Sequence, residues 1–229
     1  MENTSYDSLK IDPGEVLRYL GYGTSRPDPM VAAQLTEAIR AAERLAKPAA
    51  VYRSFAIRRT EDDIALEGTS LILAGETART MLASCSHCLL LAATAGSALD
   101  AEIRRRQIRD MAAALIFDSA ASCAVEALCD RLTADLEREY ESRGQFLTDR
   151  FSPGYGDLDL AIQPAIIRTL SADKSIGVTV TSGMLLLPVK SVTVVIGIAD
   201  TPQPKRISGC AHCKMNTTCK FRKAGTTCA

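Results

Sequence analysis

The sequence has little of what histidine-based catalysis or a strongly charged partner requires. It holds only two histidines, His87 and His212, and neither belongs to a plausible Ser-His-Asp or Cys-His arrangement. Basic and acidic residues number 27 each, so no overall field attracts nucleic acid or an anionic membrane. The opening MENTSYDSL is too polar for a secretory signal, and the longest apolar runs are too short to span a bilayer. We therefore expect a cytoplasmic protein without nucleic-acid or membrane partners.

The composition is that of a folded chain with a distinct end. Hydrophobic residues make up 47% and charged residues 24% of the 229 residues, which is ordinary for a globular protein. Six basic and no acidic residues lie between Lys205 and Ala229, together with four of the eight cysteines. We predict a globular domain over 1–204 and a cysteine-rich tail over 205–229.

Helical and strand patterns are both present, and they do not alternate strictly. Asp12 and Asp28 each precede a proline and mark helix starts. Leu115 belongs to the apolar stripe of a long helical region that breaks near Asp110. The patterns predict helices over 12–20, 28–47, 76–84, 98–143 and 165–170, and strands over 51–57, 71–73, 89–93, 178–180, 184–187 and 192–198, the last three as a meander. This order favours an α+β fold with a twisted, mostly antiparallel sheet flanked by helices.

A turn-rich segment, Arg150-Phe-Ser-Pro-Gly-Tyr155, follows the long helix. Pro153 and Gly154 suit the central positions of a type II turn, where glycine supplies the positive φ. The fork of Arg150 can hold a carboxylate, and Tyr155 adds an aromatic face with a polar tip. Residues of these types could hold an amino-acid-bearing ligand such as S-adenosylmethionine, although an ordinary surface turn has the same composition.

Several motifs of the chain resemble one family. Arg150–Tyr155 is similar to the Arg-x-x-x-Gly-Tyr segment of the activation domain of cobalamin-dependent methionine synthase. Residues 177–192, which end in a Pro-x-x-Ser-Val element, resemble a strand pair of that domain. Residues 15–22, 93–96 and 120–130 resemble standalone activation proteins of the family. The resemblance covers about residues 10–200, with Ser182 standing where the large enzyme carries Glu.

The resemblance implies a role in reactivation. Domains of this family bind S-adenosylmethionine and dock over the cobalamin of a methyltransferase, where a methyl group and one electron restore the methylated cofactor. The electron comes from a reductase or a flavodoxin- or ferredoxin-type donor. Carried over by position, Arg150 would clamp the ligand carboxylate, Ser152 and Gly154 would offer backbone groups, and Tyr155 would lie at the ligand and corrin face.

The tail carries Cys210, Cys213, Cys219 and Cys228, whose number and opening spacing are typical of a tetrathiolate site. Zinc and an iron–sulfur cluster both fit these ligands, and neighbouring basic residues would offset the negative charge. The alternative is a redox-sensitive tail without a metal. A basic zinc module that contacts nucleic acid is disfavoured, because aromatic residues do not alternate with the basic residues of the tail.

Other candidate features have simpler interpretations. Cys85 and Cys88 lie against an apolar run and are expected to pack in the core. The charge run over 102–109 is expected to be a solvated helix face, with a partner-docking patch as the alternative. Two other functions stay open at this point: a non-catalytic docking module for a corrinoid protein with a structural zinc, and an iron–sulfur reductive activator.

Overall fold

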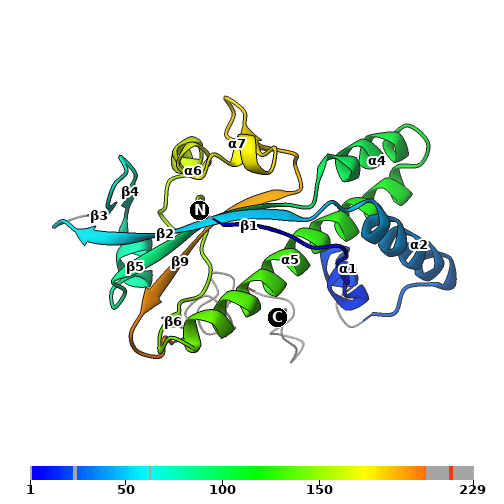
Figure 1. Ribbon diagram of the computed structural model, residues 1–229. Coiled ribbons are helices and arrows are strands. Elements are labelled where there is room, and N and C mark those ends of the chain that lie inside the picture. Colours follow the sequence, from blue (N-terminus) through cyan, green and yellow to red (C-terminus); the bar gives the residue numbers. More distant parts are fainter. Residues whose placement is uncertain (1, 23–24, 62, 205–216, 219–229) are drawn as a thin grey trace.

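The computed structural model describes residues 2–22, 25–61, 63–204 and 217–218, and these form a main sheet with helices on both faces and a separate two-stranded sheet (Figure 1). The helices are α1 (Pro13–Tyr19), α2 (Pro29–Leu45), α3 (Glu76–Met81), α4 (Ser97–Gln107), α5 (Met111–Glu141), α6 (Gln163–Thr169) and α7 (Ala172–Ser175), with a 3₁₀ turn η1 (Leu160–Ile162). The strands are β1 (Glu2–Ser5), β2 (Ala49–Arg59), β3 (Asp63–Leu66), β4 (Ile72–Ala74), β5 (His87–Thr94), β6 (Phe146–Leu147), β7 (Thr179–Val180), β8 (Leu186–Leu187) and β9 (Ser191–Ala199).

The main sheet is antiparallel throughout, in the order β4-β3-β2-β5-β9-β6, with β1 paired to β2. The predicted α+β class with a mostly antiparallel sheet is therefore confirmed. The predicted meander is wrong, because β7 and β8 pair only with each other whereas β9 pairs with β5 from Ser191 to Ile198. Most of β9 is buried on both of its faces, which suits a strand inside a two-sided sheet better than an exposed hairpin.

Two cores lie on opposite faces of this sheet. One is built from α1, α2, α4 and α5 against alternate residues of β5 such as Leu89 and Leu91. The other is built from α3, α6 and α7 against the intervening residues of β5, such as Leu90 and Ala92. In Figure 1, α6 and α7 lie above the sheet while α1 and α5 lie below it. The alternation of side chains along a strand produces this division.

The long helix α5 is the main element of the lower core. The predicted break is confirmed: the side chain of Asp110 accepts hydrogen bonds from the backbone of Ala112 and Ala113 and so caps α5. By length and composition alone α5 could cross a membrane, but 61% of its most apolar window is buried inside the protein. Leu115, expected in the apolar stripe, is instead exposed, while the next residue, Ile116, is buried.

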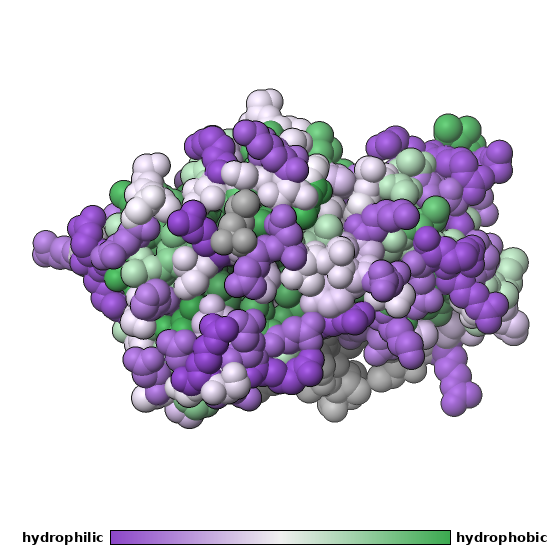
Figure 2. Space-filling view, in the orientation of Figure 1, coloured by the Kyte–Doolittle hydropathy of each residue, from purple (hydrophilic) through white to green (hydrophobic). Residues whose placement is uncertain are grey.

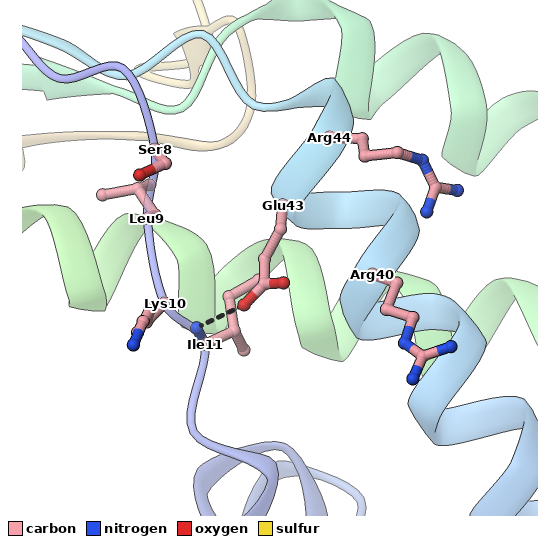
Figure 3. Close-up of a pocket in the computed structure, with 7 residues that line it drawn as sticks. All are labelled: Ser8, Leu9, Lys10, Ile11, Arg40, Glu43 and Arg44. Carbon is pink, nitrogen blue, oxygen red and sulfur yellow. Dashed lines mark hydrogen bonds between the residues drawn. The ribbon is translucent and has the colours of Figure 1, made fainter.

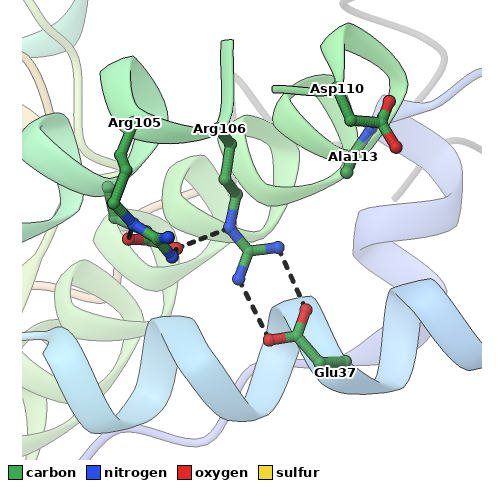
Figure 4. Close-up of polar contacts among 6 residues, drawn as sticks. Glu37, Arg105, Arg106, Asp110 and Ala113 are labelled. Atoms are coloured by element: carbon green, nitrogen blue, oxygen red, sulfur yellow. Dashed lines mark hydrogen bonds and ion pairs between the residues drawn. The ribbon is translucent and has the colours of Figure 1, made fainter. Parts of the chain in front are cut away.

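The charge run on α4 is only partly a solvated face. Arg106 makes two 3.0 Å hydrogen bonds to the Glu37 carboxylate on α2, and its Nε donates to Glu102 at 2.7 Å (Figure 4). Its guanidinium also stacks over the Phe117 ring at 4.5 Å. The Arg106 side chain is only 14% exposed, so this arginine fixes α4 against α2, in contrast to the exposed Arg104.

The first ordered element begins earlier than the sequence indicated. Residues Glu2–Ser5 form β1, which extends the sheet beside β2 in register from Glu2↔Tyr52 to Ser5↔Ala49. The strand is polar because it lies at an edge, where backbone hydrogen bonds rather than burial hold it. The Tyr52 hydroxyl adds a 2.7 Å bond to the Glu2 carboxylate.

Candidate functional site

The segment from Ser152 to Tyr155 forms the predicted turn. The Tyr155 backbone N–H donates to the Ser152 carbonyl at 2.9 Å, and Gly154 has φ +87°, as a type II turn requires at its third position. The Gly154 N–H donates to the Leu158 carbonyl at 2.8 Å, and the Leu158 N–H donates back to Tyr155. The loop is thus closed on itself by its own backbone groups.

The same loop is attached to the start of α3. The Asp157 carboxylate accepts the backbone N–H groups of Glu76 and Thr77 at 2.7 and 2.8 Å, and the Asp157 N–H donates to the Thr77 hydroxyl. Hydrogen bonds from Thr77 and from the Glu76 backbone lower the pKa of Asp157 to about 2. Gly156 has φ +63°, and a Cβ there would lie 2.0 Å from the Thr77 Oγ1. The turn is therefore held at a fixed place beside the sheet.

Arg150 extends from this loop to α5. Its Nη1 lies 2.8 Å from the Asp130 Oδ1, its Nη2 lies 3.3 Å from the Glu126 Oε2, and Nη1 also donates to the Thr133 hydroxyl. The Arg150 side chain is 26% exposed, whereas both acids are largely solvent-accessible. Because Arg150 pairs with two solvent-exposed carboxylates, its guanidinium lies at the surface, where a further charged group can reach it.

The acids that contact Arg150 belong to a longer polar row on α5. Asp118, Ser122, Glu126 and Asp130 follow one another at intervals of four residues, so they lie on one face of the helix. We call these four residues the α5 polar row. Lys190, which directly precedes β9, contacts its other end: the Nζ lies 2.9 Å from the Asp118 Oδ1 and donates to the Ser122 hydroxyl at 2.9 Å. Arg150 and Lys190 thus hold the two ends of the row.

Between these two cations one stretch of β9 lacks a strand partner on the edge away from β5, among the described residues. Val195 exchanges both of its backbone hydrogen bonds with Phe151, on the edge away from β5. By the alternation of an antiparallel ladder, the N–H and C=O of Thr193 point to that same edge. Within the described part of the chain, no strand pairs with β9 at Thr193 on this side. These two backbone groups lack a strand partner but are not open to solvent, because Thr193 is only 1% exposed.

The structure does not bring all four predicted loop residues to one place. Arg150 reaches the α5 side of the sheet, whereas Phe151 and Tyr155 pack against the core on the opposite side. The Ser152 carbonyl and the Gly154 N–H are hydrogen-bonded within the loop. The guanidinium and the phenol are consequently separated by the sheet edge, and the groups around Arg150 come from α5.

The sequence prediction missed the α5 polar row and Lys190. A signal was present: polar residues recur every fourth position from 118 to 130, a stretch that is otherwise apolar except for Ser119. Such a row in an otherwise buried helix indicates a face that meets solvent, a ligand or ion-pair partners.

The described residues contain no cluster of three or more His, Cys, Asp or Glu side chains that could hold a metal ion. Cys85, Cys88, Cys123 and Cys129 are buried, which confirms core packing for Cys85 and Cys88. Burial raises the pKa of Cys88 and of Cys129 to about 12. The four cysteines proposed as ligands, Cys210, Cys213, Cys219 and Cys228, lie outside the described residues.

A separate groove of about 500 Å³ lies between residues 8–11 and α2. Figure 3 shows Glu43 reaching across to the Ile11 backbone, with a 3.0 Å hydrogen bond, while Arg40 and Arg44 project from the other side of α2. Hydrophilic residues gather over α2 and α4 in this region of the surface (Figure 2). The groove therefore joins the N-terminal segment to α2, and its arginines face solvent.

Comparison with known proteins identifies the architecture. No protein-family model and no curated protein matches the chain. The crystal structure of the MetH reactivation domain bound to AdoHcy matches it with a TM-score of 0.67 and 15% sequence identity, over 99% of this chain and 86% of that chain. The chain has the fold of the MetH reactivation domain. The fold implied by the resemblance of the sequence motifs is thus confirmed.

Proposed function

We propose that the chain is an activation protein that binds S-adenosylmethionine and supports reductive remethylation of cob(II)alamin on a corrinoid-dependent methyltransferase, namely methionine synthase. The observation that carries this proposal is the likeness over nearly the whole chain to a reactivation domain solved with AdoHcy. The cluster around Arg150 supplies the matching chemistry within this chain.

The amino-acid end of the ligand fits the Arg150 cluster. A guanidinium pairs with a carboxylate through two parallel hydrogen bonds, and carboxylates pair with an ammonium. Arg150 would hold the ligand carboxylate, while Glu126 and Asp130 would hold its ammonium group and face the positive sulfonium. Loss of the existing ion pairs would cost little because both acids are already largely hydrated.

The adenosine end would extend along the α5 polar row toward Lys190. The Pro-Gly turn and its attachment to α3 would serve to fix Arg150, with Tyr155 supporting the loop from the opposite face.

The chain needs no nucleophile of its own for this role. When bound on the partner, the corrinoid supplies the nucleophilic metal, and the protein contributes binding and orientation. Holding the methyl donor in line with its acceptor can be worth roughly 7–11 kcal/mol. The electron would come from a reductase or a flavodoxin- or ferredoxin-type protein.

An exposed apolar surface next to the α5 polar row would meet the partner. Met111 and Leu115 precede the row on α5, and Leu187 and Val189 precede Lys190; all four are exposed. Large apolar side chains that gather at the surface mark interaction sites. The ligand would then lie at the border of the interface with the corrinoid protein.

Calorimetric titration with AdoHcy tests the ligand site. We expect the wild-type chain to bind it, and Arg150→Ala to weaken binding by about tenfold or more because a charge-assisted pair is lost. Arg143→Ala is the matched control, since Arg143 lies just after α5 and pairs with Glu139 of that helix, away from the row.

A second ligand separates the amino-acid clamp from the rest of the site. 5′-Methylthioadenosine lacks the carboxylate and the ammonium group, so Arg150→Ala should leave its affinity unchanged. Equal loss for both ligands would point to a damaged fold, and no AdoHcy binding by the wild-type chain would overturn the proposal. A reactivation assay with cob(II)alamin on a candidate methyltransferase then tests the reaction itself.

A further inference from the structure

A second, smaller pocket lies on the other face of the sheet, between β2, the turn that joins β3 to β4, and α6. Its volume is about 300 Å³. It is lined by Arg53, Gly68, Thr69, Ser70, Ala165, Arg168 and Thr169. None of these residues belongs to the Arg150 cluster or to the α5 polar row.

The charge of this pocket is its distinctive feature. Arg53 and Arg168 both line it, and no acidic residue does. Several arginines of the described chain make ion pairs, as Arg106 does with Glu37. Within the described residues the Arg53 guanidinium only stacks on Phe55, at 4.9 Å, and the Arg168 guanidinium makes no hydrogen bond or ion pair. Two guanidinium groups therefore face one small cavity without a counter-charge.

The other polar groups of the pocket favour the same kind of ligand. The Thr69 hydroxyl is occupied, because it donates to the Leu66 carbonyl at 2.8 Å and accepts the Leu71 N–H. The hydroxyls of Ser70 and Thr169 have no partner among the described residues and can donate. Guanidinium forks and hydroxyl donors around a small space suit a tetrahedral oxyanion.

The pocket is independent of the Arg150 cluster. Val51, Arg53 and Phe55 share one face of β2, and the outer two belong to the core beneath α6. Arg150 instead pairs with α5 on the opposite face. A ligand in one site does not compete for side chains with a ligand in the other.

We propose that this pocket binds a doubly charged phosphate group, held between Arg53 and Arg168 with the Ser70 and Thr169 hydroxyls as further donors. The two guanidinium charges balance a dianion. A singly charged carboxylate would leave one cation unpaired. A cavity of this size holds a phosphate together with a small attached group.

Thermal unfolding and calorimetry with inorganic phosphate test the proposal, with sodium chloride added to equal ionic strength. Phosphate should raise the Tm of the wild-type chain by linkage and should do so more than acetate. Arg53→Ala and Arg168→Ala should each weaken phosphate binding by about tenfold or more. Arg40→Ala is the control, because Arg40 also lacks a partner among the described residues but lies on α2.

Two further arms identify the source and the independence of the site. Ribose 5-phosphate, tested beside free phosphate, shows whether the group is bound as a monoester or as the free ion. Saturating AdoHcy should leave phosphate affinity unchanged, and Arg168→Ala should leave AdoHcy affinity unchanged. A failure of phosphate binding is therefore distinguishable from a failure of the proposed activation function. Equal effects of phosphate on wild type, Arg53→Ala and Arg168→Ala would overturn the proposal, as would stabilisation by chloride alone.

Discussion

The Arg150 Nη1 lies 2.8 Å from the Asp130 Oδ1, and this pair joins the loop after β6 to the middle of α5. Asp130 is 71% exposed in this pair, so its carboxylate remains largely hydrated. An ion pair of this kind contributes only about 0–1 kcal/mol to stability. The pair is therefore easily opened, which suits a group that exchanges one carboxylate for that of a ligand.

Asp130→Asn should separate stability from binding. We expect its free energy of unfolding to change by less than about 1 kcal/mol, since a surface pair is lost. AdoHcy affinity should fall, because Asp130 would no longer hold the ligand ammonium. Glu139→Gln, which breaks an exposed pair between α5 and Arg143 just beyond its end, should leave affinity unchanged. Tighter binding by Asp130→Asn would mean that Asp130 only competes with the ligand for Arg150.

Gly156→Ala should be more destabilising than an alanine at another positive-φ glycine. Gly156 has φ +63° and a Cβ there would lie 2.0 Å from the Thr77 Oγ1, whereas Gly144 has φ +73° with nothing within 4 Å. The left-handed conformation costs both variants about 1–3 kcal/mol, and only Gly156→Ala also displaces Thr77. Denaturant unfolding of the two variants measures the difference. Equal losses would show that the contact with α3 contributes nothing.

The Asp157 carboxylate should make stability fall in acid. Its pKa is lowered from 3.8 to about 2 in the folded chain. A lowered carboxyl pKa stabilises the fold above the unfolded value, and this stabilisation disappears as the pH falls through the folded value. The Tm difference between wild type and Asp157→Asn should therefore be constant above about pH 5 and shrink toward pH 2. A difference that does not change with pH would contradict this account.

Local signals in the sequence were enough for most helices. Asp12, Asp28 and Asp110 each accept backbone hydrogen bonds at the start of a helix, as their sequence neighbours indicated. The Pro-Gly turn was also predictable, because φ at Gly154 depends on the residues of the turn itself. Each of these features is decided within four residues along the chain.

Features that depend on distant pairing could not be predicted in the same way. The polar strand β1 forms only because β2 offers an edge, and β9 leaves the expected meander because β5 lies beside it. The site followed the same rule: the partners of Arg150 lie 20 and 24 residues earlier on α5. The four-residue spacing of these acids was visible in the sequence. The sequence did not show that the loop carrying Arg150 would pack against them.

Neighbouring residues on α5 should separate partner docking from folding. Leu115 is 60% exposed and Ile116 only 6%. Ile116→Ala should cost about 2–5 kcal/mol of stability because it leaves a cavity in the core. Leu115→Ala should leave the Tm unchanged yet slow reactivation of the corrinoid protein, because it removes contact area from the proposed docking surface. Unchanged reactivation in Leu115→Ala, with AdoHcy bound normally, would place the partner on another surface.

The eight cysteines should divide into two groups when the folded protein is treated with iodoacetamide. Cys88 and Cys129 should stay unlabelled at pH 8, because burial raises the pKa of each thiol to about 12 and shields it from the reagent. If Cys210 and the other three tail cysteines bind a metal, as their spacing predicts, they should be labelled only after a chelator has removed it. Mass spectrometry of the labelled peptides measures both groups, and metal analysis with absorption spectra distinguishes zinc from iron–sulfur. Full labelling of the tail before chelation, with no metal found, would show that these thiols act without one.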